Sequence, residues 1–284
     1  MDKHEAFAPG KIILTGEYAV VFGFPGIAVP SSLGMKITFT KDLARPDLTI
    51  DWRGIRGDDK WMEYLHDIVE HCQKQPEKIF NGTLTIENDL PLGKGMGSST
   101  SLVVAVARCL LGEDCKNKAT EIEDAMNPGH SGIDFAVIWN AQPVFFQHEH
   151  PLELITLPED LLAGSLLIDT GAPNETTPEL VSWVEERREE LKDTFKIIGN
   201  CTEELKEGKD IKEIIREHHQ AQKALGIVPK DVQKLIASIE EIGGSAKIIG
   251  AGGRTGGGGM VLALHDDRSA LQNAIPEEFP TFDL

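Results

Sequence analysis

A glycine-rich segment between an expected strand and an expected helix constrains this chain more than any other feature. The segment begins at Pro91, ends at Thr100 and reads PLGKGMGSST. Apolar and polar residues alternate in the preceding GTLTIEND, over 82–89, which predicts a half-buried strand. The apolar run SLVVAVARCLL, over 101–111, predicts a helix directly afterwards. The local order is therefore strand, glycine-rich turn, helix.

This order predicts a phosphate-binding loop. Alternate glycines permit positive φ angles and a close approach of the backbone to a ligand, and the serines lie where a helix leaves its first N–H groups unpaired. A helix N-terminus adds about half a positive charge, so main-chain dipoles can hold the phosphates of a nucleotide. The residues expected to contact the nucleotide are Pro91, Gly93, Lys94, Gly95, Met96, Gly97, Ser98, Ser99 and Thr100. The simpler alternative is a tight turn with a serine cap.

The glycine segment differs from the two commonest nucleotide-binding motifs. No Lys-Ser or Lys-Thr pair follows its last glycine, so it is not a Walker A motif. Its glycines are spaced i, i+2, i+4, and the polar alternation of the strand before it favours an antiparallel sheet over a dinucleotide-binding fold.

The charge balance limits the partners. With 28 basic and 46 acidic residues the net charge is −18, which works against binding to nucleic acid or to an anionic membrane. We expect a small-molecule partner whose phosphate is held by local dipoles, a few cations and a metal ion. The four cysteines show no metal-ligand spacing and the first residues have no secretory character, so reduced thiols and a cytoplasmic location are expected.

Hydrophobic patterning predicts an α+β chain with a boundary near residue 150, giving regions 1–150 and 151–284. Strands are expected over 27–40, 48–52, 144–147, 152–157, 165–169, 247–249 and 260–264, and helices over 60–75 and 119–126. The segment 178–242 is expected to form three amphipathic helices, with breaks near Asn200 and 226–229.

Lys11 and Asp134 are charged residues in apolar surroundings. Buried lysine is rare without a partner, and a Lys11–Asp134 pair would satisfy both groups. Such a pair suits proton abstraction from a hydroxyl, because the carboxylate accepts the proton while the ammonium stabilises the developing negative charge. A purely structural ion pair is the alternative.

A metal ion is expected beside this pair. Glu123 precedes Asp134 by eleven positions and, together with the Ser99 hydroxyl, could give Mg²⁺ hard oxygen ligands. On its own, Glu123 is no better a candidate than Glu121 or Asp124 and would more often lie on the surface.

Four segments, in this order, carry a resemblance to a known family: APGKIILTGEYAVVFG, PLGKGMGSSTSL, NPGHSGIDFAV and KIIGAGGRTGGGG. The chain resembles the GHMP small-molecule kinases, and within them it is most similar to the mevalonate kinase branch. The resemblance implies a two-lobed α+β fold, with an N-terminal mixed-sheet lobe that binds ATP and carries out catalysis. A C-terminal α/β sandwich lobe would close the active site.

The resemblance also implies roles for single residues. Asp134 would be the catalytic base with Lys11 beside it, Ser99 and Glu123 would hold Mg²⁺, and the segment 93–99 would bind ATP. The residues implied to contact the acceptor are Glu17, Tyr18, Gly132, Thr176, Gly252 and Gly253. For Thr176, a role at a helix start is an equal alternative.

Three departures from the family pattern concern the acceptor. Tyr18 stands where the mevalonate kinase branch usually has histidine, and Phe145 where it usually has an arginine near the substrate carboxylate. Arg254 and Thr255 lengthen the last glycine motif, and Arg254 is either a replacement anion contact or an exposed loop residue.

The resemblance implies an ATP- and Mg²⁺-dependent kinase that converts mevalonate to 5-phosphomevalonate. A phosphomevalonate kinase or another GHMP-type small-molecule kinase is one alternative, and a nucleotide-binding regulator without catalysis is another. No nucleic-acid or membrane partner is expected, and a homodimer is left open.

Overall fold

Two long strands at the start of the chain belong partly to one compact unit and partly to another. The computed structural model describes residues 3–74 and 79–284. Unit 1 comprises residues 1–11, 30–92 and 97–141, and unit 2 comprises residues 12–29, 93–96 and 142–284. Strand β1 (Lys3–Thr15) passes from unit 1 into unit 2, and β2 (Gly26–Lys41) passes back.

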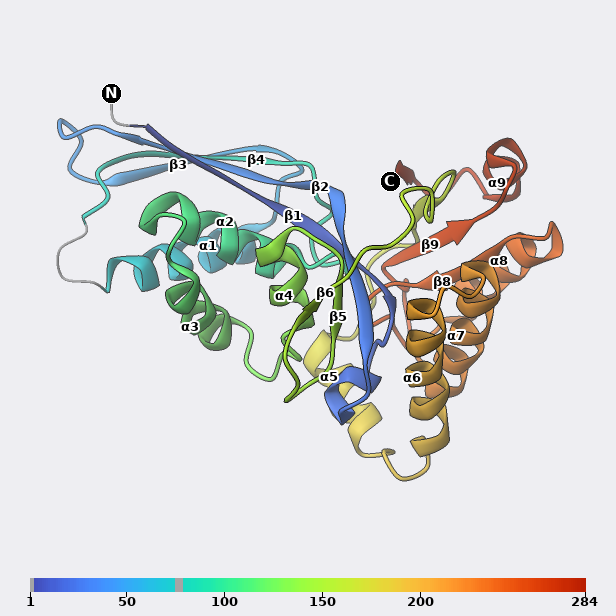
Figure 1. Cartoon of the computed structure of the whole chain (residues 1–284). Helices are drawn as coiled ribbons and strands as arrows, with labels where there is room; N and C mark the ends of the chain where they lie inside the picture. Colours follow the sequence, from blue (N-terminus) through green and yellow to red (C-terminus); the bar gives the residue numbers. More distant parts are fainter. Residues whose placement is uncertain (1–2, 75–78) are drawn as a thin grey trace. The chain divides into compact units, whose positions relative to one another are not determined.

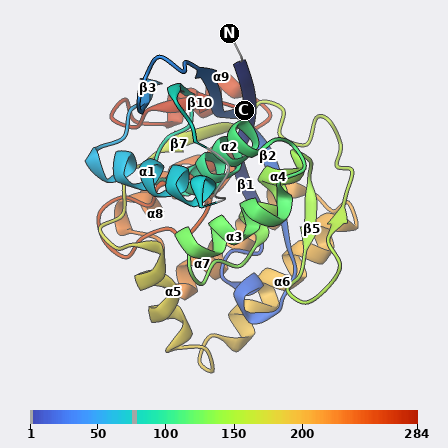
Figure 2. The same ribbon diagram turned by 90° about the vertical axis from the view of Figure 1, so that its left-hand side faces the viewer.

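Unit 1 is a mixed sheet with helices on one face. Strand β4 (Gly82–Asn88) pairs antiparallel with β2 and parallel with β3 (Leu48–Gly54). The helices are α1 (Asp59–Gln73), α2 (Ser98–Leu111), α3 (Lys116–Met126) and α4 (Ile133–Asn140). Helix α2 contacts the other three, and the four helices can be followed together in Figure 2. Its sequence explains this position, because from Leu102 onward its side chains are apolar except Arg108, and most of them are buried.

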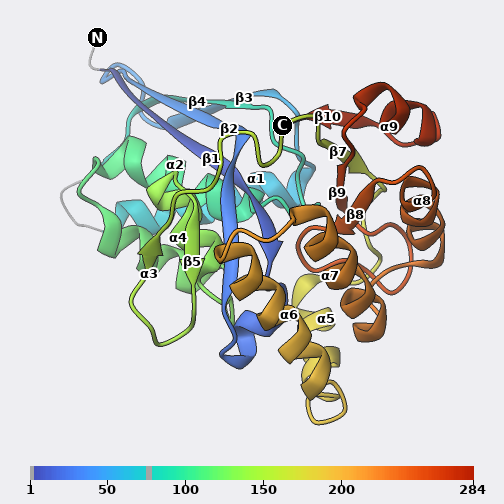
Figure 3. The same ribbon diagram turned by 45° about the vertical axis from the view of Figure 1, so that its right-hand side comes forward.

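Unit 2 contains an antiparallel sheet in the order β10-β7-β9-β8, formed by β7 (Leu166–Asp169), β8 (Ser245–Ile248), β9 (Met260–Leu264) and β10 (Thr281–Asp283). Its helices are α5 (Thr177–Glu185), α6 (Lys192–Lys206), α7 (Ile211–Leu225), α8 (Lys230–Glu241) and α9 (Arg268–Ala274). Helices α7 and α8 pack on β8, and α6 packs on α7 (Figure 3).

Unit 2 also contains three short elements: a 3₁₀ turn, η1 (Ala19–Phe22), and two short strands, β5 (Val144–Phe146) and β6 (Glu153–Leu154). Strands β5 and β6 are labelled in Figure 1. Strand β5 pairs with the start of β2 and with β6.

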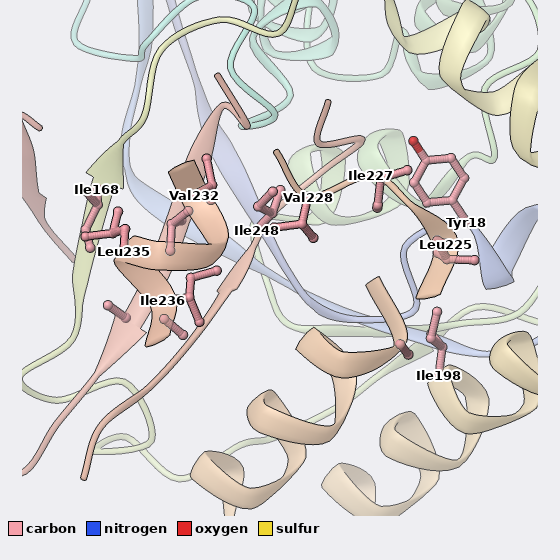
Figure 4. Close-up of a cluster of buried hydrophobic side chains, with 14 of the residues drawn as sticks. Tyr18, Ile168, Ile198, Leu225, Ile227, Val228, Val232, Leu235, Ile236 and Ile248 are labelled. Atoms are coloured by element: carbon pink, nitrogen blue, oxygen red, sulfur yellow. The ribbon is translucent and has the colours of Figure 1, made fainter. Parts of the chain in front are cut away.

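The apolar core of unit 2 joins the sheet to its helices. Ile168 and Ile248 come from the strands, and Val232, Leu235 and Ile236 come from α8 (Figure 4). The ring of Tyr18 lies at one edge of this cluster, near Leu225 and Ile227, with its hydroxyl pointing away from the apolar side chains. The core therefore fixes the position of a residue that the sequence assigned to substrate binding.

The expected α+β class is confirmed, and three details differ from expectation. The units are interleaved along the chain and not divided by one cut near residue 150, because β1 and β2 each continue from one unit into the other. The segment 178–242 forms four helices, since Asn200 lies within α6 and the breaks come at 186–191 and 207–210. Strand β4, expected in an antiparallel sheet, has one parallel neighbour. Gln75, the expected end of the first long helix, lies outside the described residues.

Among the residues that the structure describes, no helix combines the length and the apolar character needed to cross a lipid bilayer.

Candidate active site

The Lys11 and Asp134 side chains form an ion pair in unit 1. Lys11 Nζ lies 3.2 Å from Asp134 Oδ1. The lysine side chain is only 3% exposed, whereas the aspartate side chain is 32% exposed. Asp134 lies in the first turn of α4, immediately after Gly132 and Ile133, where the helix N-terminus favours a negative charge. The pair therefore presents a carboxylate to solvent and keeps its cation behind it.

Gly97 makes room for the stem of Lys11. It is the N-cap of α2 and has φ = +72°, a conformation that residues with a side chain rarely adopt. A Cβ atom at this position would lie 2.9 Å from Lys11 Cγ and 2.9 Å from Ile138 Cδ1. The third glycine of the loop is thus needed for packing against the lysine as well as for the turn.

Glu123 is a buried carboxylate with one free oxygen. The Thr100 hydroxyl donates to Glu123 Oε1 at 2.7 Å, whereas no hydrogen bond from a described residue reaches the buried Oε2. Burial raises the pKa of Glu123; the Thr100 hydrogen bond opposes this rise and the charge of Asp134 adds to it. Thr100, expected to bind the nucleotide, instead directs its hydroxyl to Glu123.

Tyr64 on α1 belongs to the same cluster and was missed by the sequence reasoning, which treated the aromatic residues of this helix as packing residues. Asn127 Nδ2 donates to the Tyr64 hydroxyl at 2.9 Å. Burial and then the charge of Glu123 raise the pKa of Tyr64, while hydrogen bonds from Asn127 and Ser99 oppose the rise. The phenol is therefore protonated near neutral pH and lies beside both expected metal ligands.

The cluster around Glu123, Thr100, Tyr64 and Ser99 suits a hard cation that takes only some of its ligands from the protein. Glu123 Oε2 and the Ser99 hydroxyl are oxygen donors, and oxygen is what Mg²⁺ prefers. Within the described residues, no group of three or more His, Cys, Asp and Glu side chains could hold a metal by itself. A Mg²⁺ ion here would need further oxygens from phosphate and water, as is usual in nucleotide sites.

In unit 2, Gly95 contacts the second glycine loop, which connects β8 to β9. A Cβ atom on Gly95 would lie 2.4 Å from the Ile249 carbonyl oxygen, so the two backbones touch. Met260 N donates to the Lys94 carbonyl at 3.0 Å. A small cavity is lined by Gly93, Lys94, Gly95, Pro173, Thr177, Ile249, Ala251, Gly252, Gly258 and Gly259.

Lys94 supplies a cation at this cavity. Its ammonium pairs with Asp169 at the end of β7, and the other oxygen of Asp169 accepts the Gly171 N–H at 2.9 Å. Lys94 is partly exposed, which is compatible with its expected contact to phosphate.

Tyr18, in the turn between β1 and η1, contacts the second glycine loop. Its backbone has φ = +63°, and its hydroxyl donates to the Ala251 carbonyl at 2.6 Å. Burial and then the charges of Glu17 and Glu175 raise the pKa of Tyr18, so the hydroxyl remains a donor. The strained backbone directs the ring across to the loop that lines the cavity.

Glu17 lies in a sealed polar cluster. Its carboxylate pairs with the fully buried Lys247 of β8, which also donates to the Ile13 carbonyl at 3.1 Å. Glu17 Oε2 lies 3.0 Å from His218 Nε2, which accepts the Gly16 N–H at 3.2 Å. Burial would raise the pKa of Glu17, but the ammonium of Lys247 outweighs it and holds the pKa at about 2. Sequence reasoning placed Glu17 at the acceptor and missed Lys247 and His218, which lie more than 200 positions away.

Several expected contact residues serve the local backbone. The Thr176 hydroxyl accepts the Glu179 N–H in a capping box at the start of α5, which agrees with its alternative role as a helix-start residue. Gly252 has φ = +69°, and a Cβ atom on it would lie 2.4 Å from the Ile227 carbonyl oxygen. Gly253 N donates to that same carbonyl at 2.9 Å. Pro91 and Met96 are buried.

A lysine ammonium lies against the ring of Phe145 on β5. Lys206 Nζ lies 3.9 Å from the centre of its ring and also pairs with Glu153 at 2.7 Å. This lysine is already engaged by a carboxylate, so it does not simply replace the arginine expected at position 145.

Two family models match the chain: "GHMP kinases N terminal domain" over residues 63–137 and "GHMP kinases C terminal" over residues 201–281. Together they account for more than half of the chain. The chain belongs to the GHMP kinase family. The first match includes the loop–helix segment, Glu123 and Asp134, and the second includes Lys247 and the second glycine loop.

Relatives within the GHMP kinases span nearly the whole chain. The mevalonate kinase of Thermococcus gammatolerans is 29% identical, covering 95% of this chain and 92% of the relative. That of Archaeoglobus fulgidus is 27% identical, covering 91% of each. Among solved structures, the mevalonate kinase of Methanococcus jannaschii has a TM-score of 0.81 at 19% identity, covering 99% of this chain and 97% of its own. The mevalonate kinase of Staphylococcus aureus has a TM-score of 0.69 at 26% identity and 99% coverage of both chains.

Proposed function

We propose that this GHMP kinase transfers the γ-phosphoryl group of ATP to the primary hydroxyl of mevalonate, giving 5-phosphomevalonate for isoprenoid precursor synthesis. The similarity to curated mevalonate kinases along almost the entire chain supports the substrate. The chemistry is supported by the side chains themselves.

One observation carries the proposal: the open carboxylate of the Lys11–Asp134 pair. A purely structural ion pair would contribute little to stability here, because one of its partners is accessible to solvent. Here the lysine is buried and the aspartate is accessible. This arrangement leaves an Asp134 oxygen free to accept the proton of an acceptor hydroxyl while Lys11 stabilises the charge that develops.

The remaining groups position the phosphates. In phosphoryl transfer, catalysis is mostly positioning and charge stabilisation. The main-chain N–H groups at the start of α2 provide a favourable end of a helix dipole for an anion. Lys94 adds a cation within the glycine segment, and Asp169 orients it.

We assign the Mg²⁺ contacts to Ser99 and Glu123, with Thr100 and Tyr64 orienting them. When bound, Mg²⁺ would neutralise phosphate charge. Glu123 needs an ionised carboxylate for this role, and a bound dication would reverse the upward shift of its pKa that burial causes.

The chief rival is a regulator that binds nucleotide without turnover. It does not account for the accessible Asp134 beside a buried lysine, an arrangement that binding alone would not require. A phosphomevalonate kinase would transfer to a phosphate, which needs more cations than the Lys206–Phe145 region supplies.

The test is a substrate screen of the purified chain. Mevalonate, phosphomevalonate, homoserine and galactose are each incubated with ATP and Mg²⁺, and the products are identified by mass. We expect phosphorylation of mevalonate at its primary hydroxyl. Turnover of phosphomevalonate alone would refute the assigned acceptor, and no turnover of any alcohol, with ATP still bound, would favour the regulator.

A further inference from the structure

The second glycine loop contains an arginine whose backbone is tied down. Glu175 accepts the N–H groups of Arg254 and Thr255, at 3.0 and 3.3 Å, and the Thr255 hydroxyl, at 2.7 Å. Asn174 donates to the same hydroxyl at 3.2 Å, and Pro173 bridges to Gly256. The extra residues therefore form a braced turn, although they are exposed to solvent.

The Arg254 guanidinium is held on an aromatic platform. Its central carbon lies 4.4 Å from the centre of the Trp183 ring on α5. Stacking of this kind fixes the plane of the guanidinium and leaves its N–H edge available. No described residue accepts a hydrogen bond from this edge, because Glu175 is engaged by the backbone and by Thr255.

Arg187 shows the contrasting arrangement on the same ring. Its central carbon lies 4.6 Å from the centre of Trp183, but its N–H groups donate to the Leu225 carbonyl and to Glu190, at 3.1 Å each. Trp183 thus has two arginine neighbours, of which one is fully engaged within the protein. The other, Arg254, is preorganised and has donors to spare.

Arg254 also lies on the loop that forms the small cavity of unit 2. Ala251 and Gly252, just before it, line the cavity together with the glycines at 93 and 95. Ala251 accepts the Tyr18 hydroxyl. Arg254 itself does not line the cavity, but it follows Gly252 by two residues in the same loop.

We propose that Arg254 binds the carboxylate of the acceptor substrate and so selects an acid. The inference rests on the proposed function, in which the acceptor is mevalonate. A guanidinium edge matches a carboxylate with two parallel hydrogen bonds. In a chain of net charge −18, an anionic acceptor needs such a local cation. Phe145 cannot supply it, and Lys206 beside that ring is paired with Glu153.

The experiment compares two acceptors that differ only at the recognised group: mevalonate, and 3-methylpentane-1,3,5-triol, in which a CH₂OH group replaces the carboxylate. For Arg254→Gln we expect the KM for mevalonate to rise about 10- to 100-fold, the loss typical of a hydrogen-bonded charge pair. The kcat for mevalonate, the KM for ATP and kcat/KM for the triol should stay within about threefold. Arg254→Lys should recover part of the mevalonate affinity.

Arg188→Gln is the matched control, because Arg188 is also stacked on an aromatic ring, 5.2 Å from the centre of Phe22. It should leave all four constants unchanged, and thermal unfolding should show that each variant is folded. Equal losses for mevalonate and the triol would mean that Arg254 only braces the loop. A rise confined to the KM for ATP would assign it to nucleotide phosphate. Either result overturns the proposal.

The experiment distinguishes failure of the Arg254 inference from failure of the proposed function. If the parent chain phosphorylates mevalonate and Arg254→Gln does so equally well, the inference falls and the proposed function stands. If the parent chain does not phosphorylate mevalonate, both fall.

Discussion

Each unit of the protein contains a lysine paired with a carboxylate, but the two carboxylates face different surroundings. In unit 1, Lys11 is buried and Asp134 is 32% exposed. In unit 2, Lys247 and Glu17 are both sealed, with at most 2% of either side chain exposed. A base must reach its substrate, so only the unit 1 pair can exchange a proton with a ligand.

The groups that contact the two ion pairs also differ. The charge of Glu17 is balanced by Lys247 and contacted by His218, and Lys247 also reaches the Ile13 carbonyl. Such dense pairing is what a buried carboxylate requires, because desolvation otherwise neutralises it. A lysine–carboxylate pair is therefore proposed to be catalytic in unit 1, whereas the pair in unit 2 is a sealed structural link next to Tyr18.

Replacing the open carboxylate should have the largest effect. We expect Asp134→Asn to lower kcat about 10³-fold, since loss of a general base commonly removes 10²- to 10⁴-fold. ATP affinity should stay within a few-fold, and the unfolding temperature should fall, because the buried Lys11 ammonium loses its paired charge. The measurements are steady-state kinetics, nucleotide titration and thermal unfolding. Undiminished turnover would exclude Asp134 from the proton transfer.

Breaking the sealed pair should instead act on stability. Lys247→Met leaves the Glu17 carboxylate buried without its main partner, which typically costs about 3–5 kcal/mol. Chemical denaturation would measure this loss. Lys11→Met is the matched control: its partner is partly solvated, so we expect a smaller loss of stability and a larger loss of kcat.

A double variant sharpens the same comparison. Glu17→Leu with Lys247→Met removes both charges, and it should recover part of the stability lost by Lys247→Met alone. If the single variant proved as stable as the parent, the sealed pair would not be a structural link.

The pairing of Lys11 with Asp134 could be predicted from the sequence, whereas the sealed pair of unit 2 could not. Lys11 and Asp134 each stand alone among apolar residues in segments of recognisable character, so pairing them satisfied two isolated charges. Glu17 lies in an equally apolar segment, but its partner is 230 positions away in a strand whose pattern shows only that it is buried. Exposure decides between a base and a structural link, and sequence patterns do not report it.

Local signals predicted the elements well where burial and periodicity agreed, as in α2, β7 and β9. They failed at α6, which continues through Asn200 because one face packs on α7. They also failed for Tyr64, whose helix pattern indicates packing only. Its role depends on Asn127 and Glu123, brought beside it by the contact between α1 and α3.

As the pH falls, we expect protonation of His219 to lower the free energy of unfolding before protonation of Glu17 does. Burial lowers the pKa of His219, the residue after His218 on α7, to about 4. The unfolded chain therefore takes up this proton first, and stability falls as the pH drops from about 6.5 towards 4, by up to about 3 kcal/mol. The contribution of Glu17, with its pKa held at about 2, is lost only as the pH falls from about 4.5 through 2.

Unfolding free energies measured between pH 7 and 4 test this order. His219→Gln should make the pH dependence between 6.5 and 4 less steep, and the part that remains is expected from His218, whose pKa burial also lowers. A conservative change at exposed His66 on α1 should leave the dependence unaltered. An equally steep loss in His219→Gln would contradict the assignment.

Glu123 offers the finest test, because it combines features of both pairs: it is buried like Glu17, yet its Oε2 receives no hydrogen bond from the described residues. The Tyr64→Phe variant removes a neighbouring hydroxyl and keeps the ring. If Oε2 of Glu123 is kept for Mg²⁺, this variant should raise the Mg²⁺ concentration needed for half-maximal activity several-fold. That change corresponds to a loss of about 1 kcal/mol in Mg²⁺ binding. The kcat at saturating Mg²⁺ should hardly change. Trp61→Phe alters the ring that meets Tyr64 edge-on and should leave the Mg²⁺ requirement as it is. Equal responses from the two variants would mean that Tyr64 only packs, and that burial with a free oxygen does not by itself indicate a metal ligand.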